Sequence, residues 1–251
     1  MQQVLRIRKI QELFSQREFM SFEEMCSKFN SSKSSIRRDL IELESKGVLR
    51  RVHGGALSLQ TRDEVMDFRR LAESSHDEKI RLGKKAASLV EDGQTVLLGG
   101  GSTVVEVAKN LTERPIQVVT NSIPVAQAFW DSKLVEVTLT GGYLFPRSGV
   151  ELGPICEKML NSVSADILFI GIRGITEAGI SDSNSLIVES IRAMIRAAQK
   201  VVVVADHSKF GRNAMIHVAE LSDLDQIVTD IQIAPEFQEV LSRNNVICTI
   251  A

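Results

Sequence analysis

Apolar residues near the start of the chain are grouped in short blocks with helical spacing. Between Val4 and Arg17 they recur mostly at intervals of three and four, which predicts an amphipathic helix. Residues 19–21 are expected to form a short strand, and the apolar residues of FEEMCSKF (22–29) again share one face of a helix. The start of the chain therefore predicts a helix, a short strand and a second helix.

The polar segment NSSKS (30–34) separates this second helix from a third. Asn and Ser favour helix starts because their side chains accept hydrogen bonds from free backbone N–H groups. The elements predicted downstream are a helix from Ser32 or Lys33 to Lys46, a strand over 49–52, a tight turn at 53–55 and a returning strand over 56–59. Helix, helix, turn, helix and hairpin is the order of a winged helix-turn-helix.

The rest of the chain follows a different pattern. Residues 58–75 are polar and charged, as expected for a connector. From His76 onward, helical segments alternate with short apolar runs, namely TVLL, IQVVT, VEVTLT, DILFIGI, VVVVA, IVTD and NVICTI. This alternation predicts an α/β domain whose mostly parallel sheet is covered on both faces. We therefore expect a winged helix over 1–57, a linker over 58–76 and a second domain over 77–251.

Charge is distributed unevenly between the predicted parts. The chain of 251 residues has a formal net charge of −2. Residues 1–62 contain 12 Lys and Arg against 7 Asp and Glu, whereas the remainder contains 18 against 25. A basic part in an acidic protein indicates that this part meets a polyanion.

The composition disfavours several classes of protein. No apolar run approaches the roughly 18 residues of a membrane span, and the start lacks the cleavage site of a secretory signal, so we expect a cytoplasmic protein. Cys26, Cys156 and Cys248 are far apart and form no CxxC or Cys/His cluster, which predicts neither disulfides nor a zinc site. We expect no cofactor and no bound metal.

The predicted third helix has an apolar face and a basic face. On a helical wheel Leu40 and Leu43 lie on one side, Arg38 lies near the opposite side and Arg37 lies on the flank. One face can pack on a core while the other meets DNA. A hydrated helix surface is the alternative, because a pair of Arg residues on a helix is usually only solvated.

The neighbourhood of this helix favours DNA binding. Ser34 and Ser35 are small and lie at the helix start, where close approach to DNA is needed. Arg50 and Arg51 precede a turn containing His53, whose adjacent glycines let the hairpin tip approach a DNA backbone or minor groove closely. The short helix and tight turn before the third helix point the same way.

The segment SSKSSIRRDLIELESKGVLRRVHGGAL resembles the helix-turn-helix and wing of the DeoR family of bacterial regulators of sugar metabolism. The resemblance covers nearly all of residues 1–57. It implies that the third helix enters the major groove of double-stranded DNA and that the hairpin is a DNA-contacting wing. The contact residues that it implies are Lys33, Ser34, Ser35, Arg37 and Arg38 on the helix and Arg50, Arg51 and His53 in the wing.

The segment LLGGGSTVVEVA (97–108) places three glycines between a predicted strand and a predicted helix. At such a turn the free backbone N–H groups and the positive helix end converge with nearby hydroxyls on a space that suits an anion. The spacing matches neither the dinucleotide GxGxxG pattern nor a P-loop, which needs a following Lys. We therefore expect Gly100, Gly101, Ser102 and Thr103 to hold a phosphate, with a plain strand-to-helix turn as the alternative.

A second strand end, VVTNS, places Thr120, Asn121 and Ser122 at another predicted helix start. In open parallel sheets, ligands bind beyond the carboxyl ends of the strands, where both segments fall. Gly142 would let the backbone approach a ligand, or serve only as a turn. Lys209 offers a cation, although an exposed Lys in a loop is more often merely hydrated.

The segments LTGGYLFPRSGVELG, FIGIRGI and VVVVADHSKFGR extend the resemblance to the DeoR effector domain. That domain is similar in fold to sugar-phosphate isomerases such as ribose-5-phosphate isomerase, and the implied ligand is a phosphorylated sugar or related metabolite that changes DNA affinity. Two positions depart from the family pattern, because Gly99 replaces the usual Asp and Ile191 the usual Lys. Arg173 or Arg192 is then a candidate for the missing charge, and Glu189 for accepting a ligand hydroxyl.

Three functions fit these observations: a ligand-responsive transcriptional regulator, a sugar-phosphate isomerase with a DNA-binding module, and a second domain that only oligomerises. An isomerase needs a base beside the reacting carbons, but Asp166 falls at the wrong end of its predicted strand. We therefore predict a repressor without enzymatic activity or a membrane partner. A homo-oligomer is expected because symmetric regulators bind paired half-sites.

Overall fold

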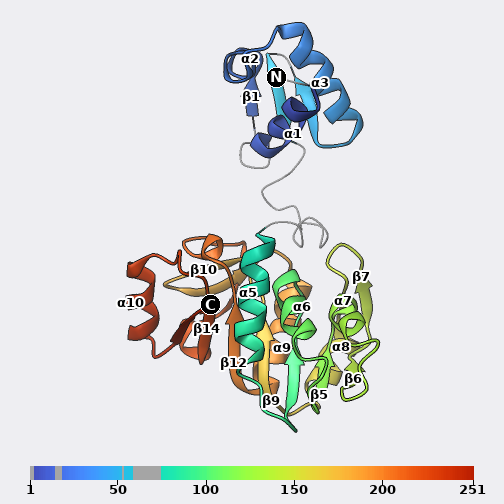
Figure 1. Ribbon diagram of the computed structural model, residues 1–251, viewed down its shortest axis with the longest axis vertical. Coiled ribbons are helices and arrows are strands. Elements are labelled where there is room, and N and C mark those ends of the chain that lie inside the picture. The colour runs from blue at the N-terminus through green and yellow to red at the C-terminus, as the bar shows by residue number, and fades with distance from the viewer. Residues whose placement is uncertain (1–2, 15–18, 53, 59–74) are drawn as a thin grey trace. The chain divides into compact units, whose positions relative to one another are not determined.

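The computed structural model describes residues 3–14, 19–52, 54–58 and 75–251. The chain divides into two compact units, Met1–Glu64 and Val65–Ala251 (Figure 1). We call them the N-terminal unit and the α/β unit, and each is described by itself.

In its described residues the N-terminal unit contains three helices and a three-stranded antiparallel sheet of order β1-β3-β2. Its elements are α1 (Gln3–Phe14), β1 (Phe19–Ser21), α2 (Phe22–Phe29), α3 (Lys33–Ser45), β2 (Leu49–Val52) and β3 (Gly55–Ser58). This order confirms the winged helix that the apolar spacing predicts. His53, at the predicted tip of the wing, lies outside the described residues.

Side-chain caps define where the helices of the N-terminal unit begin. Ser21 and Glu24 form a capping box at the start of α2, each side chain hydrogen-bonding the backbone N–H of the other. Ser32 caps α3 by accepting from the backbone N–H of Ser35 at 3.3 Å. The buried faces then meet in a core that includes Ile10, Phe14, Met25, Ile36, Leu40 and Leu43.

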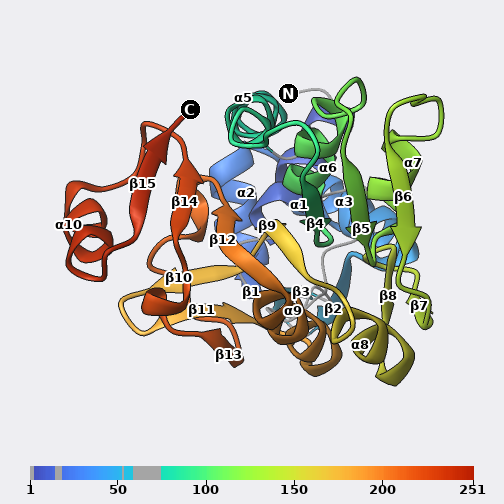
Figure 2. The ribbon, with the colours of Figure 1, turned by 90° about the horizontal axis from the view of Figure 1, so that it is seen from below.

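The α/β unit is built on a seven-stranded parallel sheet of order β15-β14-β12-β9-β4-β5-β6 (Figure 2). The strands are β4 (Thr95–Leu98), β5 (Gln117–Thr120), β6 (Glu136–Leu139), β9 (Ala165–Ile170), β12 (Ala198–Val204), β14 (Gln226–Thr229) and β15 (Ile247–Ile250). The mostly parallel α/β sheet expected from the sequence is thereby confirmed.

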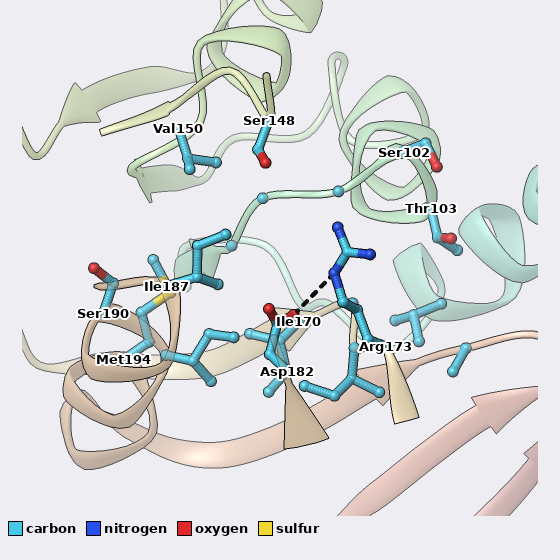
Figure 3. A pocket seen from close by; sticks show the side chains of 18 of the residues that line it. Ser102, Thr103, Ser148, Val150, Ile170, Arg173, Asp182, Ile187, Ser190 and Met194 are labelled. Atoms are coloured by element: carbon cyan, nitrogen blue, oxygen red, sulfur yellow. Dashed lines mark ion pairs between the residues drawn. The ribbon is translucent and has the colours of Figure 1, made fainter. Parts of the chain in front are cut away.

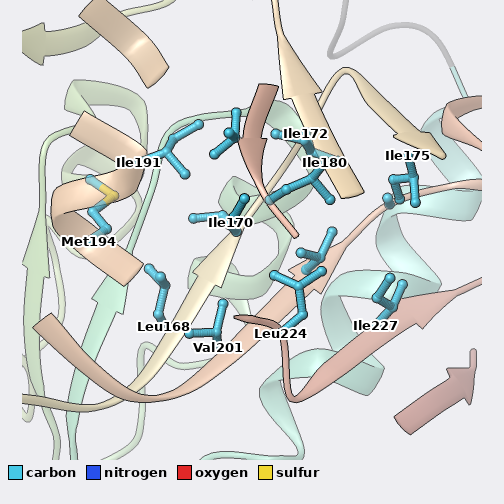
Figure 4. Close-up of a cluster of buried hydrophobic side chains, with 14 of the residues drawn as sticks. Leu168, Ile170, Ile172, Ile175, Ile180, Ile191, Met194, Val201, Leu224 and Ile227 are labelled. Carbon is cyan, nitrogen blue, oxygen red and sulfur yellow. The ribbon is translucent and has the colours of Figure 1, made fainter. Parts of the chain in front are cut away.

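Helices cover both faces of this sheet, as Figure 2 shows. They are α5 (His76–Ala87), α6 (Ser102–Lys109), α7 (Ile123–Ala128), α8 (Pro154–Leu160), α9 (Ser185–Ala197) and α10 (Pro235–Arg243). Successive strand residues point to opposite faces. Leu98 packs in the apolar cluster that contains Leu82 of α5, whereas Leu97 packs in the cluster that contains Met194 of α9. Figure 4 shows part of this second cluster around Leu168 and Met194. Both faces of the central strands are therefore buried.

Several short elements of the α/β unit are not predicted by the sequence patterns. They are α8, the hairpin β7 (Tyr143–Phe145) and β8 (Val150–Leu152), the small sheet β10 (Gly174–Thr176), β11 (Gly179–Asp182) and β13 (Ile216–Ala219), and the 3-10 turns η1 (His207–Lys209) and η2 (Leu221–Asp223). Elements this short, which lie outside the alternation of apolar runs and helical segments, give no periodicity that would identify them.

The strand order reverses between β4 and β9. From β4 the chain runs outward through β5 to β6, and it then returns to place β9 on the other side of β4. Such a reversal leaves a crevice beyond the carboxyl ends of the two strands, because their following segments turn away in opposite directions. Gly99 follows β4 and Gly171 follows β9 at this point.

Candidate functional site: a basic helix surface and an anion-suited cavity

Helix α3 exposes the basic residues that the sequence analysis assigns to DNA. Lys33, Arg37 and Arg38 are exposed, whereas Ile36 on the opposite face is fully buried. Arg37 also contacts α2, because its guanidinium lies over the Phe22 ring at 5.6 Å from the ring centroid. The helix therefore presents a basic surface whose orientation is fixed by its apolar face.

The start of α3 carries a cluster of hydroxyls. The Ser32 hydroxyl lies 2.9 Å from that of Ser34 and 3.0 Å from that of Ser35. Ser34 is exposed and Ser35 is half-buried. These small side chains leave the helix start open to a partner.

Arg50 and Arg51 of β2 are both exposed. Arg51 contacts Glu44 of α3 twice, through its backbone N–H at 2.8 Å and its side-chain Nε at 2.6 Å. The backbone and side-chain hydrogen bonds from Arg51 lower the pKa of Glu44. The ion pair connects the wing to the helix that carries Arg37 and Arg38.

One polar residue in the same helix has a structural role that sequence analysis missed. Asp39 is fully buried and accepts two hydrogen bonds from Arg6 of α1, at 2.5 Å from Nε and 3.3 Å from the second guanidinium nitrogen. The hydrogen bond with Asp39 raises the pKa of Arg6. In IRRDL, therefore, an exposed Arg38 directly precedes a buried Asp39 that joins α3 to α1.

A cavity of about 180 Å³ lies at the strand reversal of the α/β unit. We call it the α6 cavity. Its lining comes from the segments after β4, β5, β9 and β12, from the starts of α5 and α6, from α9, from β11 and from the hairpin β7–β8 (Figure 3). The lining residues are Lys79, Gly99, Gly100, Gly101, Ser102, Thr103, Asn121, Ser148, Val150, Leu152, Ile170, Gly171, Ile172, Arg173, Asp182, Ile187, Ser190, Ile191, Met194, Val204, Ala205, Lys209 and Arg212.

The glycine turn forms one wall of the α6 cavity. Gly101 is the N-cap of α6 with a φ of 125°, a conformation that residues with a side chain rarely adopt, and no side chain caps the helix there. A Cβ on Gly101 would meet no heavy atom within 4 Å, so space is open beside the start of α6. The positive helix end and the hydroxyls of Ser102 and Thr103 border this space.

Basic side chains outnumber acidic ones around the cavity. Lys79, Arg173, Lys209 and Arg212 line it together with one carboxylate, Asp182, which lies 3.7 Å from Arg173 Nε. Burial lowers the pKa of Lys79, and repulsion by Lys209 lowers it further. Burial also lowers the pKa of Lys209, with repulsion from Arg212 and Arg173, while Asp206 opposes the change. A bound anion would relieve this repulsion.

Seven of the predicted effector-binding residues lie in the wall of the cavity. They are Gly100, Gly101, Ser102, Thr103, Asn121, Arg173 and Lys209. Arg192, the other candidate for the missing charge, instead donates to the backbone oxygens of His217 and Val218, at 2.7 and 3.1 Å. Of the two candidates, Arg173 is the one in the cavity wall.

Four other predicted effector residues contact the surrounding structure and not the cavity. The Thr120 hydroxyl donates to Leu98 O at 2.7 Å, and Ser122 caps α7. A Cβ on Gly142 would lie 2.6 Å from the carbonyl oxygen of Leu152, so close packing requires glycine there. Glu189 is exposed and pairs with Arg192 at 2.9 Å.

Lys79, Asp182, Arg212 and the apolar residues of α9 are the parts of the cavity wall that the sequence analysis missed. Lys79 belongs to an ordinary amphipathic pattern, HDEKIRLGKKAA, which contains no signal for a ligand. Arg212 lies three residues after Lys209 in VVVVADHSKFGR. This segment indicates part of the ligand site in the sequence but does not single out Arg212. Folding, and not spacing, brings these side chains together.

A winged helix followed by an α/β unit with an anion-suited cavity is the architecture of a ligand-responsive, DNA-binding transcriptional regulator. Residues 6–62 match the DeoR-like helix-turn-helix domain, and residues 74–231 match the DeoR C terminal sensor domain. The chain belongs to the DeoR family of transcriptional regulators.

Relatives with assigned functions are similar over almost the whole chain. The HTH-type transcriptional repressor GlcR of Bacillus subtilis is 32% identical over 98% of this chain and 95% of its own. The glycerol-3-phosphate regulon repressor of Escherichia coli is 33% identical over 98% of both chains. Both relatives are named as repressors, which is the class of function that the sequence predicts for this chain.

Among solved structures, ribose 5-phosphate isomerase A from Methanocaldococcus jannaschii matches 55% of each chain with 20% identity and a TM-score of 0.41. In the described part of this chain, none of the helices is both long and apolar enough to cross a lipid bilayer.

Proposed function

We propose that this regulator represses carbohydrate-metabolism genes and that a phosphorylated metabolite in the α6 cavity changes its affinity for DNA. The observation that carries the proposal is the convergence of four basic side chains on the open space beside the start of α6. Phosphate binds well at such a place because helix N–H groups and basic side chains favour the same charge.

In this proposal Ser102, Thr103 and the first N–H groups of α6 hold the phosphate. Lys79, Arg173 and Lys209 neutralise its charge. Asn121 accepts from a ligand hydroxyl, because its buried Oδ1 has no hydrogen-bond partner among the described residues. Its amide nitrogen is already used, donating to Glu151 O at 3.0 Å.

The proposed DNA surface consists of α3 and the wing. Lys33, Ser34, Ser35, Arg37 and Arg38 face the major groove, and Arg50, Arg51 and His53 contact DNA beside it. Contacts to phosphates supply salt-dependent affinity, while the side chains that reach base edges supply sequence specificity. The exposure of the basic residues of α3 supports this arrangement.

Helix α5 offers a physical route from the ligand to DNA binding. It is the first described element after residues 59–74, and Lys79 lies in its first turn, with its N–H donating to Ser75 O at 3.1 Å. We place the winged helix at 1–57, the linker at 58–76 and the effector-binding domain at 77–251. A ligand that contacts Lys79 therefore contacts the helix that the linker enters.

We further propose that the protein binds its ligand without turnover and acts as a homo-oligomer. Exposed apolar side chains lie on or near the edge strand β6 and the hairpin β7–β8, including Trp130 at 85%, Tyr143 at 60% and Ile155 at 67% exposure. Edge strands with apolar surroundings tend to pair. A second copy of the chain is the proposed partner. Light scattering measures the mass of the assembly and so the number of copies in it.

The proposed division of roles is tested by fluorescence anisotropy on DNA from upstream of the gene, at fixed salt, with and without a panel of sugar phosphates. Arg38→Ala is expected to weaken DNA binding by about ten-fold and to leave ligand binding unchanged. Ser102→Ala is expected to weaken ligand binding by about ten-fold and to leave DNA binding unchanged.

Matched controls remove a positive charge and a hydroxyl elsewhere. Lys84→Ala removes an exposed positive charge on α5, and Ser162→Ala removes an exposed hydroxyl after α8. Both controls should behave as the unsubstituted protein does. If either test variant loses DNA binding and ligand binding together while its melting temperature is unchanged, the two-site proposal is wrong.

A further inference from the structure

The α6 cavity has two chemically different ends. Figure 3 shows Ser102 and Thr103 on one side, Ile187 and Met194 of α9 on the other, and Arg173 pointing between them. The first end is polar and cationic. The second is largely apolar, because Val150, Leu152, Ile170, Ile187, Ile191 and Met194 line it, with Ser148 and Ser190 as its hydroxyl-bearing residues.

Gly99 and Ile191 make the second end apolar. Gly99 contributes no side chain, and a Cβ placed on it would lie 3.1 Å from Ile170 Cγ2 and 3.5 Å from Met194 Sδ. Ile191 lines the same cavity from α9 and is 7% exposed. The two positions that depart from the family pattern thus fall on the same apolar end, where a carboxylate and an amine would otherwise face a ligand.

The polar groups near this end are few and mostly engaged. Ser190 is 1% exposed, and its hydroxyl lies 3.9 Å from the sulfur of Cys156. Asn121 offers one free acceptor, its Oδ1. A ligand with one hydroxyl finds a partner at Asn121. A chain of hydroxyls facing α9 meets Ile187, Ile191 and Met194, with the buried Ser190 as the one hydroxyl that α9 contributes to the wall.

We infer that the effector is a monophosphorylated metabolite of deoxy or alkyl type, with one hydrogen-bond donor and a compact apolar end, and not a polyhydroxylated sugar phosphate. This inference rests on the proposed function of the cavity. A hydroxyl that loses water without gaining a partner weakens binding by on the order of ten-fold, whereas apolar carbon against α9 strengthens it.

Titration calorimetry on the full chain tests the inference with matched phosphates. n-Propyl phosphate and glycerol 3-phosphate have equal carbon chains and differ in two hydroxyls, and 2-deoxyribose 5-phosphate differs from ribose 5-phosphate in one. Inorganic phosphate measures the polar end alone. We expect n-propyl phosphate to bind at least ten-fold more tightly than glycerol 3-phosphate, and the deoxy sugar to bind more tightly than ribose 5-phosphate.

Variants on α9 test whether the apolar wall causes the preference. Ile187 is half-buried and lines the cavity. Ile187→Ser should therefore reduce the ratio of the affinity for n-propyl phosphate to the affinity for glycerol 3-phosphate by about ten-fold. Leu186→Ser is the matched control, because Leu186 is 43% exposed and is not among the cavity-lining residues. Ile191→Lys should favour glycerol 3-phosphate further, provided that its melting curve shows a folded α/β unit.

The outcomes separate the inference from the proposed function. Equal or tighter binding of the hydroxylated member of each pair overturns the inference and leaves the phosphate site standing. An unchanged affinity ratio in Ile187→Ser also overturns it. If none of the phosphates binds, including inorganic phosphate, the proposed function of the cavity itself fails.

Discussion

Removing the carboxylate of Asp39 tests whether IRRDL combines a DNA contact with a structural ion pair. The Asp39 side chain is 1% exposed and that of Arg6 is 11% exposed, so the pair is far less hydrated than a surface salt bridge. Breaking an exposed pair costs about 0–1 kcal/mol, and breaking a fully buried one costs about 3–5 kcal/mol. Asp39→Ala should therefore lower the unfolding free energy of the N-terminal unit by about 2 kcal/mol.

Thermal melts and DNA-binding curves distinguish Asp39→Ala from Arg38→Ala. A loss of about 2 kcal/mol changes the folding constant about thirty-fold, which is large for a unit with one small core. Asp39→Ala should therefore lower the melting temperature of the N-terminal unit and weaken DNA binding, whereas Arg38→Ala should affect DNA binding alone.

A double variant completes the test of the ion pair. Replacing Arg6 by Met and Asp39 by Leu together should lower the unfolding free energy by less than the two single changes combined. In the double variant neither member of the pair remains as a charge that has lost the other. A melting temperature unchanged in Asp39→Ala, or strictly additive losses in the double variant, would refute the structural role.

Two further predictions concern the α6 cavity. Because burial and mutual repulsion lower the pKa values of Lys79 and Lys209, these amines lose their charge at a lower pH than an ordinary Lys of pKa 10.5, and phosphate binding should weaken as pH rises toward that value. Calorimetry with inorganic phosphate above pH 8, where the phosphate is a dianion throughout, measures this loss and the accompanying proton uptake; a flat profile would contradict it. Gly100→Ala places a Cβ 2.4 Å from Val150 Cγ1, so it should destabilise the α/β unit by about 1–3 kcal/mol and weaken phosphate binding. Adding Val150→Ala removes the clash and should restore the stability and the phosphate affinity.

The winged helix could be predicted from sequence because its signals are local. Ser32 caps α3, Ile36, Leu40 and Leu43 repeat at helical intervals, and glycines mark the turn after β2. The ion pair between Arg6 and Asp39 could not be predicted in this way, because the two residues are 33 positions apart and each occurs in a charged segment. Local periodicity identifies the elements but not the polar contacts between them.

The α6 cavity was only partly predictable for a related reason. The glycine turn has a local signature, so Gly101, Ser102 and Thr103 are recognisable in the sequence. Thr120 and Ser122 have the same kind of signature, yet the Thr120 hydroxyl donates to Leu98 O of β4 and the Ser122 hydroxyl accepts from the backbone N–H of Val125 in α7. Lys79 reaches the cavity only because α5 packs on α6, a contact that no spacing within α5 reveals.

The effector can change DNA binding only as far as its affinity differs between the DNA-bound and DNA-free forms. A hundred-fold loss of DNA affinity requires a hundred-fold preference of the ligand for the DNA-free form, or about 2.8 kcal/mol. A phosphate held by the glycine turn alone would bind both forms equally if the turn keeps its geometry, as expected for a segment that directly follows the interior strand β4. The preference must come from contacts that differ between the forms, and Lys79, in the first turn of the helix that the linker enters, is the cavity residue placed to provide one.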